Sequence, residues 1–204
     1  MVMPRRIGLD LDNTVIDYTP AYRALARDMG LPQQLGDRES IRQALRKSED
    51  DDEEWQRFQS HLYTAGLGYA MPAPGLRDFL QLCGLVGVSV VIISHKTKTT
   101  PERFGSLDLR APASEWLSRQ GIVPAHVPLA GVFFCENQDA KVRTITNLKC
   151  DLFVDDLIEV LHHPDMPYGI SRVHYLAGAS FIAKTQDSTV DADFFALTTW
   201  LRSC

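Results

Sequence analysis

Long apolar stretches are absent from the sequence, and so is low-complexity sequence apart from an acidic run at residues 49–54. A helix that crosses a membrane needs about 20 consecutive apolar residues, so we expect no membrane contact. Near the start, Arg5 and Arg6 precede a short apolar run that Asp10 interrupts, which is unlike the apolar part of a secretory signal. These absences lead us to expect a cytoplasmic protein.

Cysteines are few and scattered. The four of them are Cys83, Cys135, Cys150 and Cys204. No two have the CxxC spacing of a zinc or redox site, so neither kind of site is expected. We expect reduced thiols, which fit a reducing compartment such as the cytoplasm.

An excess of positive charge is also missing, since 21 Lys and Arg residues face 26 Asp and Glu residues, for a formal net charge of -5. A mildly acidic chain has no general attraction for phosphate polymers, so we expect no nucleic-acid partner. An anionic substrate must then be bound by a local positive site or by a metal. The 204 residues, 45% of them hydrophobic, suit one globular domain with an elaboration or two small domains. Nothing in the sequence indicates an oligomeric state.

What the sequence does contain is a short apolar run at residues 7–11 that predicts a strand and brings Asp10, Asp12 and Thr14 to its end. Alternate strand residues point to the same face, so the two Asp side chains can converge on one cavity as the chain turns at Asn13. Paired carboxylates repel each other unless a cation lies between them, which favours a divalent metal. Asp10 is therefore a candidate nucleophile and Asp12 a candidate acid/base. The alternative is a simple turn after an edge strand, which Asp and Asn favour.

Helical periodicity dominates residues 18–74, and helices then alternate with apolar strands. The expected helices within and just after this segment span about residues 22–29, 38–47, 52–62 and 76–82. The acidic run complements the dipole at the start of one of them, which explains it more simply than a metal site does. Further apolar runs predict strands at about residues 88–94, 131–136, 150–154 and 170–176. This alternation is typical of an α/β fold with a buried parallel sheet.

Ser94 ends the strand predicted at residues 88–94, at the sheet edge where open α/β folds bind ligands. A Ser that only begins a loop is an equally good explanation. His95, Lys96 and Lys98 follow. They are candidates for contacting an anionic substrate, although we favour a solvated loop for each of them.

Asp155 and Asp156 follow the strand predicted at residues 150–154. Two carboxylates at the tip of a buried strand are costly unless cations or water compensate them. A metal shared with Asp10 and Asp12 explains them most economically.

The segment DLDNT at residues 10–14 resembles the first motif, DxDxT, of the haloacid dehalogenase-like (HAD) superfamily. Phosphatases of this family use the first Asp as nucleophile and the second as general acid/base. Ser94 matches the second motif, a Ser or Thr that hydrogen-bonds the transferring phosphoryl group.

The third and fourth motifs of the family also have counterparts, in the family's order. Lys141 lies one helix and one strand before Asp155, where the family places a Lys that offsets the charge of nucleophile and phosphate. Lys149 is its rival but falls at the wrong end of the sheet. Asp155 and Asp156 match the fourth motif, and Glu159 is a candidate helper outside the metal ligands.

The resemblance covers about residues 6–13 and 74–176 and does not extend to the helical segment. It implies a Rossmann-like three-layer parallel sheet with helices on both faces. Residues 1–17 and 75–204 would form this core, and residues 18–74 would form a helical cap inserted after the first strand.

The resemblance further implies a Mg²⁺-dependent hydrolysis of phosphomonoesters through an aspartyl-phosphate. The Mg²⁺ ligands would be Asp10, Asp155, Asp156 and the main-chain carbonyl of Asp12. Thr14, Ser94 and Lys141 would stabilise the phosphoryl oxygens, and His95 and Lys96 are the candidate substrate contacts. The expected partner is a small phosphorylated metabolite, a sugar phosphate or a nucleotide. The family's dehalogenases lack the second Asp, so Asp12 favours phosphoryl transfer.

Two other kinds of protein combine similar residues. A receiver-type signalling domain also joins clustered acidic residues to a Ser or Thr and a Lys, although the order of the motifs and the long insert speak against it. A member of the same family that binds a phosphorylated ligand or partner without turning it over remains the alternative.

Overall fold

The structure is a computed structural model, and it describes residues 3–32, 34–46, 52–123, 126–180, 182–183 and 189–204. It divides into two compact units. The first unit comprises Met1–Ile16, Pro72–Lys96 and Gly121–Cys204, and the second comprises Asp17–Met71 and Thr97–Gln120. The chain therefore passes between the units four times.

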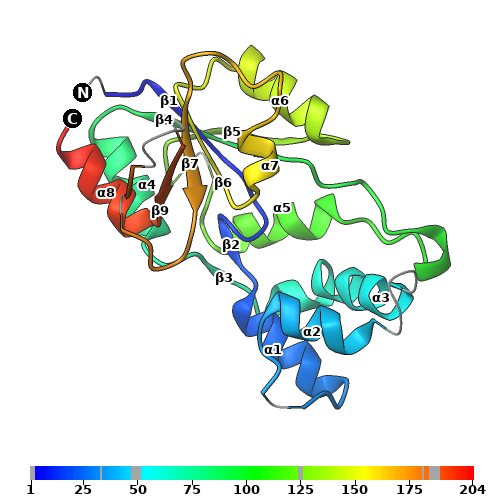
Figure 1. The fold of residues 1–204 in the computed structure, drawn as a ribbon. Coiled ribbons are helices and arrows are strands. Elements are labelled where there is room, and N and C mark those ends of the chain that lie inside the picture. Colours follow the sequence, from blue (N-terminus) through cyan, green and yellow to red (C-terminus); the bar gives the residue numbers. More distant parts are fainter. Residues whose placement is uncertain (1–2, 33, 47–51, 124–125, 181, 184–188) are drawn as a thin grey trace. The chain divides into compact units, whose positions relative to one another are not determined.

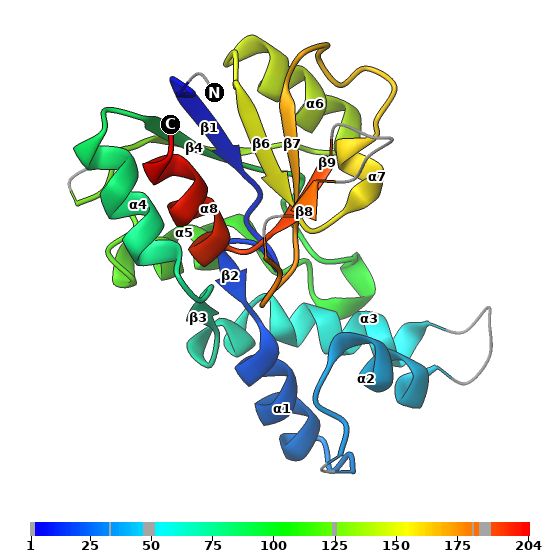
Figure 2. The ribbon, with the colours of Figure 1, turned by 60° about the vertical axis from the view of Figure 1, so that its left-hand side comes forward.

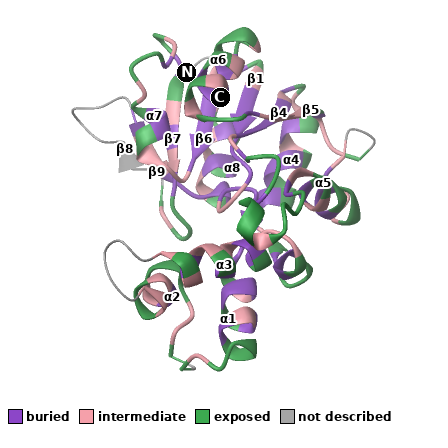
Figure 3. Ribbon diagram, turned by 90° about the vertical axis from the view of Figure 1, so that its right-hand side faces the viewer, coloured by how far each residue is buried: buried purple, intermediate pink, exposed green. Residues whose placement is uncertain are grey.

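The first unit is built on a seven-stranded sheet in the order β5-β4-β1-β6-β7-β9-β8 (Figure 1). The strands are β1 (Arg6–Leu9), β4 (Ser89–Ser94), β5 (Leu129–Phe134), β6 (Leu152–Asp155), β7 (Ser171–Tyr175), β8 (Ile182–Ala183) and β9 (Thr189–Ala192). All neighbours pair in parallel except β8, which runs antiparallel to β9. The central strands β1, β4 and β6 are apolar and buried over most of their length (Figure 3), as expected for a sheet covered on both faces.

Helices cover both faces of this sheet (Figure 2). α4 (Leu76–Leu85) packs against α8 (Phe194–Arg202) on one face, where the rings of Phe79 and Phe194 lie 5.3 Å apart. α6 (Gln138–Asn147) and α7 (Ile158–Leu161) cover the other face, and Val142 and Ile145 of α6 share a buried cluster with Val91 of β4. The prediction of a three-layer, Rossmann-like parallel sheet is confirmed.

The second unit is mainly helical. Its elements are α1 (Thr19–Asp28), α2 (Arg38–Leu45), α3 (Glu53–Leu62), the 3-10 turns η1 (Ala65–Gly68) and η2 (Glu102–Phe104), and α5 (Arg110–Arg119). The ring of Phe58 on α3 stacks on Tyr22 of α1 at 6.0 Å and on Trp55 at 5.8 Å. The segment predicted as all-helical ends in a strand, β3 (Met71–Pro72), which pairs with β2 (Ile16–Asp17).

Residues 97–120, which the sequence assigns to the core, group with the second unit instead. The buried indole of Trp116 on α5 donates a hydrogen bond to the main-chain oxygen of Ala70 at 3.2 Å. Arg103 also donates to the side chain of Gln56 on α3. These partners are 46 and 47 positions apart, and no local pattern predicts such pairings.

Part of the acidic run lies at the start of α3, as predicted. Asp52 is the N-cap residue, Glu53 and Glu54 are in the first turn, and Asp52 pairs with Arg46 at 2.6 Å. The remainder of the run, residues 49–51, lies outside the described residues. In the part of the chain that is described, no helix has both the length and the apolar character needed to span a membrane.

Candidate active site

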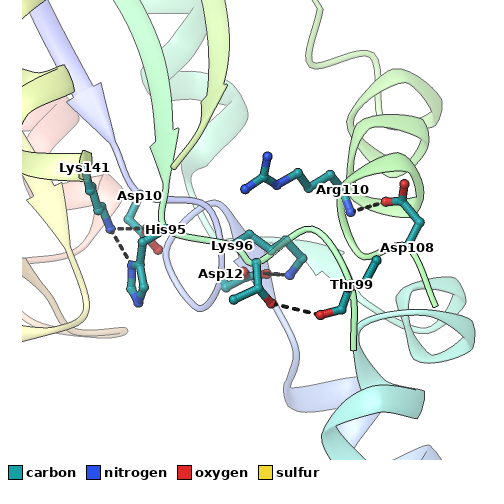
Figure 4. A network of polar contacts seen from close by, with 9 residues as sticks. Asp10, Asp12, His95, Lys96, Thr99, Asp108, Arg110 and Lys141 are labelled. Atoms are coloured by element: carbon teal, nitrogen blue, oxygen red, sulfur yellow. Dashed lines mark hydrogen bonds and ion pairs between the residues drawn. The ribbon is translucent and has the colours of Figure 1, made fainter. Parts of the chain in front are cut away.

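The loop after β1 begins at the sheet edge and turns sharply. The N–H of Asp10 donates to the carbonyl of Val154 on β6 at 2.8 Å, so Asp10 still belongs to the edge of the sheet. Asn13 adopts a left-handed conformation with φ of 59°, which Asn tolerates better than most residues. The chain thus turns at Asn13 as predicted. The carboxylates of Asp10 and Asp12 bind different lysines (Figure 4).

Lys141 lies between two buried carboxylates. Its Nζ pairs with Asp10 and, at 2.7 Å, with Asp155. The residue comes from the first turn of α6, which begins with a cap in which Asn137 accepts the N–H of Ala140. The ammonium also lies 5.5 Å from the centre of the Phe153 ring, a cation–π distance. Two acidic partners and an aromatic face compensate this fully buried charge.

Burial sets the electrostatics of this group. It raises the pKa of Asp10 to about 7, and Asp155 and Asp12 add to the rise while Lys141 opposes it. The pKa of Asp155 is also raised, chiefly by burial and against the effect of Lys141. Burial alone would lower the pKa of Lys141, but the two carboxylates outweigh it and raise that pKa. One ammonium therefore does not fully compensate the carboxylates.

The carboxylates of Asp10, Asp155 and Asp156 form a candidate metal site, because one oxygen from each lies within 4.8 Å of the others. Ionised, they carry three negative charges against the single charge of Lys141. Oxygen ligands and unbalanced negative charge suit Mg²⁺, so these residues fit the metal that the family motifs imply. The carboxylate of Asp12 is not part of the group, and a role for its main-chain carbonyl stays a prediction.

Lys96 is the cation that pairs with Asp12. Its Nζ lies 2.9 and 2.8 Å from the two carboxylate oxygens, and its side chain is only 3% exposed. The solvated-loop interpretation is therefore wrong for Lys96, because a buried ammonium is kept by its acidic partner. Lys98 is exposed, as that interpretation predicts.

His95 is half-buried beside Lys141. Its Nδ1 lies 3.5 Å from Nζ of Lys141. An ammonium only donates, so Nδ1 accepts and the ring proton of a neutral imidazole is on Nε2. Burial, followed by the charge of Lys141, lowers the pKa of His95. The ring can therefore donate from Nε2 as a neutral group.

Two buried hydroxyls complete the predicted set. Ser94 is the last residue of β4, and its carbonyl accepts the N–H of Cys135 at 2.7 Å. Thr14 is fully buried, and its Oγ1 has no hydrogen-bond partner among the described residues. An unsatisfied buried hydroxyl costs about 1–3 kcal/mol, so this donor is available to a ligand or to water.

The structure adds two residues that the sequence does not single out. His174 on β7 bonds to Asp191 on β9 and to the main-chain oxygen of Asp156. A lone His and a lone Asp in weakly patterned strands give no signal by themselves. Their register with Asp155 reveals them, and that requires the sheet order. Glu159, the predicted helper, is exposed on α7.

By sequence, the chain matches no family model and no curated protein. Solved structures do match. A haloacid dehalogenase-like hydrolase from Streptococcus pneumoniae aligns over 96% of this chain and 97% of its own, with a TM-score of 0.60 and 15% identity. Protein tyrosine kinase A from Mycobacterium tuberculosis aligns over 98% and 99%, with a TM-score of 0.62 and 18% identity. A predicted phosphoglycolate phosphatase from Haemophilus somnus aligns over 98% and 99%, with a TM-score of 0.56 and 16% identity.

The chain has the HAD-like fold. The resemblance carried by the sequence motifs is thus confirmed at the level of the fold. Similarity at these identities says nothing further about chemistry, since the similar chains include proteins named as a hydrolase and as a kinase. The reaction must be argued from the side chains that this HAD-like sheet brings to its edge.

Proposed function

We propose that the protein is a Mg²⁺-dependent phosphomonoester hydrolase that works through an aspartyl-phosphate. The observation that carries the proposal is the setting of Asp10, a carboxylate buried between Lys141 and the carboxylates of Asp155 and Asp156. A nucleophile that attacks an anionic phosphate needs positive charge nearby. Lys141 supplies one such charge, and the carboxylate oxygens can bind a metal ion that supplies more. The substrate class is a small phosphorylated metabolite, a sugar phosphate or a nucleotide.

In the first step, a carboxylate oxygen of Asp10 attacks phosphorus. A bond forms between this oxygen and phosphorus while the bond from phosphorus to the ester oxygen breaks. Asp12 donates a proton to the departing oxygen, which leaves as an alcohol. Lys96 then faces the ionised Asp12, and its buried ammonium compensates that charge.

In the second step, water attacks the phosphorus of the aspartyl-phosphate. Asp12 takes a proton from the water, the bond from phosphorus to Asp10 breaks, and inorganic phosphate leaves. Both carboxyl groups return to their starting states. Lys141 holds Asp10 in place throughout, and the hydroxyls of Thr14 and Ser94 donate to the phosphoryl oxygens.

Asp10, Asp155 and Asp156 would hold Mg²⁺, with the main-chain carbonyl of Asp12 as a further ligand. When bound, the ion supplies positive charge next to the phosphoryl oxygens. We also propose a cytoplasmic location, which agrees with four cysteines that form no disulfide.

A phosphatase assay on the purified chain tests the proposal. With p-nitrophenyl phosphate, we expect turnover in Mg²⁺, none in excess EDTA, and recovery when Mg²⁺ is restored. Full activity in excess EDTA would contradict the metal dependence. Binding of phosphate esters without any release of phosphate, across a panel of sugar phosphates, nucleotides and small acids, would favour the non-catalytic alternative.

A further inference from the structure

Three polar residues lie in register on neighbouring strands at the edge of the sheet that carries the candidate site. Asp155 on β6 pairs with His174 on β7, and His174 pairs with Asp191 on β9. Registered residues of adjacent strands point to the same face. The His174 and Asp191 side chains are each 17% exposed, so they are largely withdrawn from water.

Both ring nitrogens of His174 face acceptors. Nδ1 lies 3.0 Å from Oδ1 of Asp191, and Nε2 lies 3.2 Å from the main-chain oxygen of Asp156. A carbonyl oxygen only accepts, so Nε2 carries a proton. The contact of Nδ1 with Asp191 fixes the orientation of the ring. His174 thus donates from Nε2 to the main-chain oxygen of Asp156 while Asp191 holds the other side of its ring.

The bond from Nε2 restrains the main chain at Asp156. On the other side of this turn, Oδ1 of Asp155 accepts the N–H of Leu157 at 2.9 Å. Two hydrogen bonds therefore hold this turn, one within it from Leu157 to Asp155 and one from His174 on β7. Asp156 supplies one of the three carboxylates of the metal group and is its least buried member, so its direction depends on how firmly this turn is held.

We propose that His174, held by Asp191, is a positioning residue that keeps the Asp156 carboxylate turned toward those of Asp10 and Asp155. It thereby sets the affinity of the group for a divalent cation. This inference rests on the proposed function, because it concerns the same metal site. Removing a partner that orients a metal ligand typically weakens metal binding about 10- to 100-fold.

Calorimetric titration of the full chain with MgCl₂ tests the inference, using two variants of different reach. His174→Gln can place its amide N–H near the position of Nε2 and keep the donor to Asp156. His174→Asn is too short to do so. We expect His174→Asn to weaken Mg²⁺ binding about 10- to 100-fold and His174→Gln to weaken it far less.

His162→Asn is the matched control. In the wild type, Nε2 of His162 bonds to Oγ1 of Thr189 at the start of β9, at 3.1 Å. Because this contact does not involve the metal group, we expect the variant to have unchanged Mg²⁺ affinity. Wild-type affinity in both His174 variants would overturn the inference and leave the proposed function standing. Equal losses in the two would also overturn it, since the contact to Asp156 would then not decide affinity. A wild-type chain that binds no Mg²⁺ would overturn the metal site itself, and the inference with it.

Discussion

Single residues of the candidate site show a shortage of positive charge. Asp10 and Asp155 pair with one buried ammonium, that of Lys141, and the Asp156 carboxylate lies beside theirs, while Lys96 pairs with Asp12. Such an arrangement lowers stability in the absence of a cation, as is common where binding and catalysis require unfavourable charge.

The two aspartates of DLDNT have separable roles in the proposed reaction. Asp10→Asn should form no aspartyl-phosphate and show essentially no turnover. Asp12→Asn should lower kcat about 100- to 10,000-fold, the usual cost of losing a general acid/base. The loss should be smallest for p-nitrophenyl phosphate, whose leaving group needs little protonation. Rates on esters of graded leaving-group pKa, with trapping of the phospho-enzyme, measure this. Equal losses for good and poor leaving groups would reassign Asp12 to holding the turn and the metal.

The raised pKa of Asp10 predicts how stability depends on pH. Burial raises the pKa of Asp10 from 3.8 to about 7 on folding, so the contribution of Asp10 to the free energy of unfolding is most favourable below pH 3.8 and falls as the pH rises to about 7. A shift of about three units corresponds to roughly 4 kcal/mol at most. In EDTA, Asp10→Asn should therefore gain stability relative to the wild type between pH 4.5 and 7.5, as measured by urea unfolding.

Asp37→Asn provides the control for this experiment. The hydrogen bonds from Ser40 lower the pKa of Asp37, so its contribution is complete above 3.8 and is lost only at lower pH. Its difference from the wild type should stay constant between pH 4.5 and 7.5. A constant difference for Asp10→Asn as well would show that Asp10 does not titrate in this range.

The sequence motifs name most of the residues that meet at the sheet edge, because each one follows a strand or begins a helix. The pairing of Lys96 with Asp12, 84 positions away, could not be predicted. A lysine in a polar stretch looks solvated until a distant carboxylate is placed beside it. His174 and Asp191 could not be predicted for the same reason.

Among the strands and helices, β1 and β6 pack so closely at Gly8 that a side chain at this position would clash with β6. A Cβ added there would lie 2.5 Å from Cδ2 of Phe153 and 3.1 Å from Sγ of Cys150. The same Phe153 ring lies under the ammonium of Lys141. Gly8 thus makes room for the ring that supports the lysine of the candidate site.

Gly8→Ala should therefore destabilise the protein by about 1–3 kcal/mol, the usual cost of overpacking, and should lower any phosphatase activity through Lys141. Gly84→Ala is the matched control, since a Cβ in α4 would meet only Pro128, at 3.6 Å. It should stabilise the protein by about 0.5–1 kcal/mol through helix propensity. Thermal and urea unfolding measure both. A neutral Gly8→Ala would mean that Phe153 can move aside freely.

Most elements could be predicted because their patterns are local. The apolar β-branched run of β4 and the apolar stretch of β6 are typical of buried strands. The strands β2, β3 and β8 have two residues each, too few for any periodicity. β9 reads TVDA, which lacks a continuous apolar run, and its pairing with β7 and β8 makes it a strand.

For the whole molecule, the family resemblance implies that the helical segment at residues 18–74 serves as a cap that excludes water and large substrates. We expect small phosphorylated metabolites to be hydrolysed far faster than a phosphopeptide or duplex nucleic acid. Comparing kcat/KM for a sugar phosphate, a nucleotide and a phosphotyrosine peptide measures this. Comparable rates on the peptide would argue against the cap.

The central place of β1 in the sheet also matters during synthesis on the ribosome. β1 is translated before both of its neighbours, β4 and β6, which begin only at residues 89 and 152. At about 5–20 residues per second, β6 follows β1 by on the order of ten seconds or more. For that time this apolar strand lacks the neighbours that bury it in the folded sheet. Asp10 can meet Lys141 and Asp155 only after residue 155 has been translated, so products that stop before it lack the assembled site.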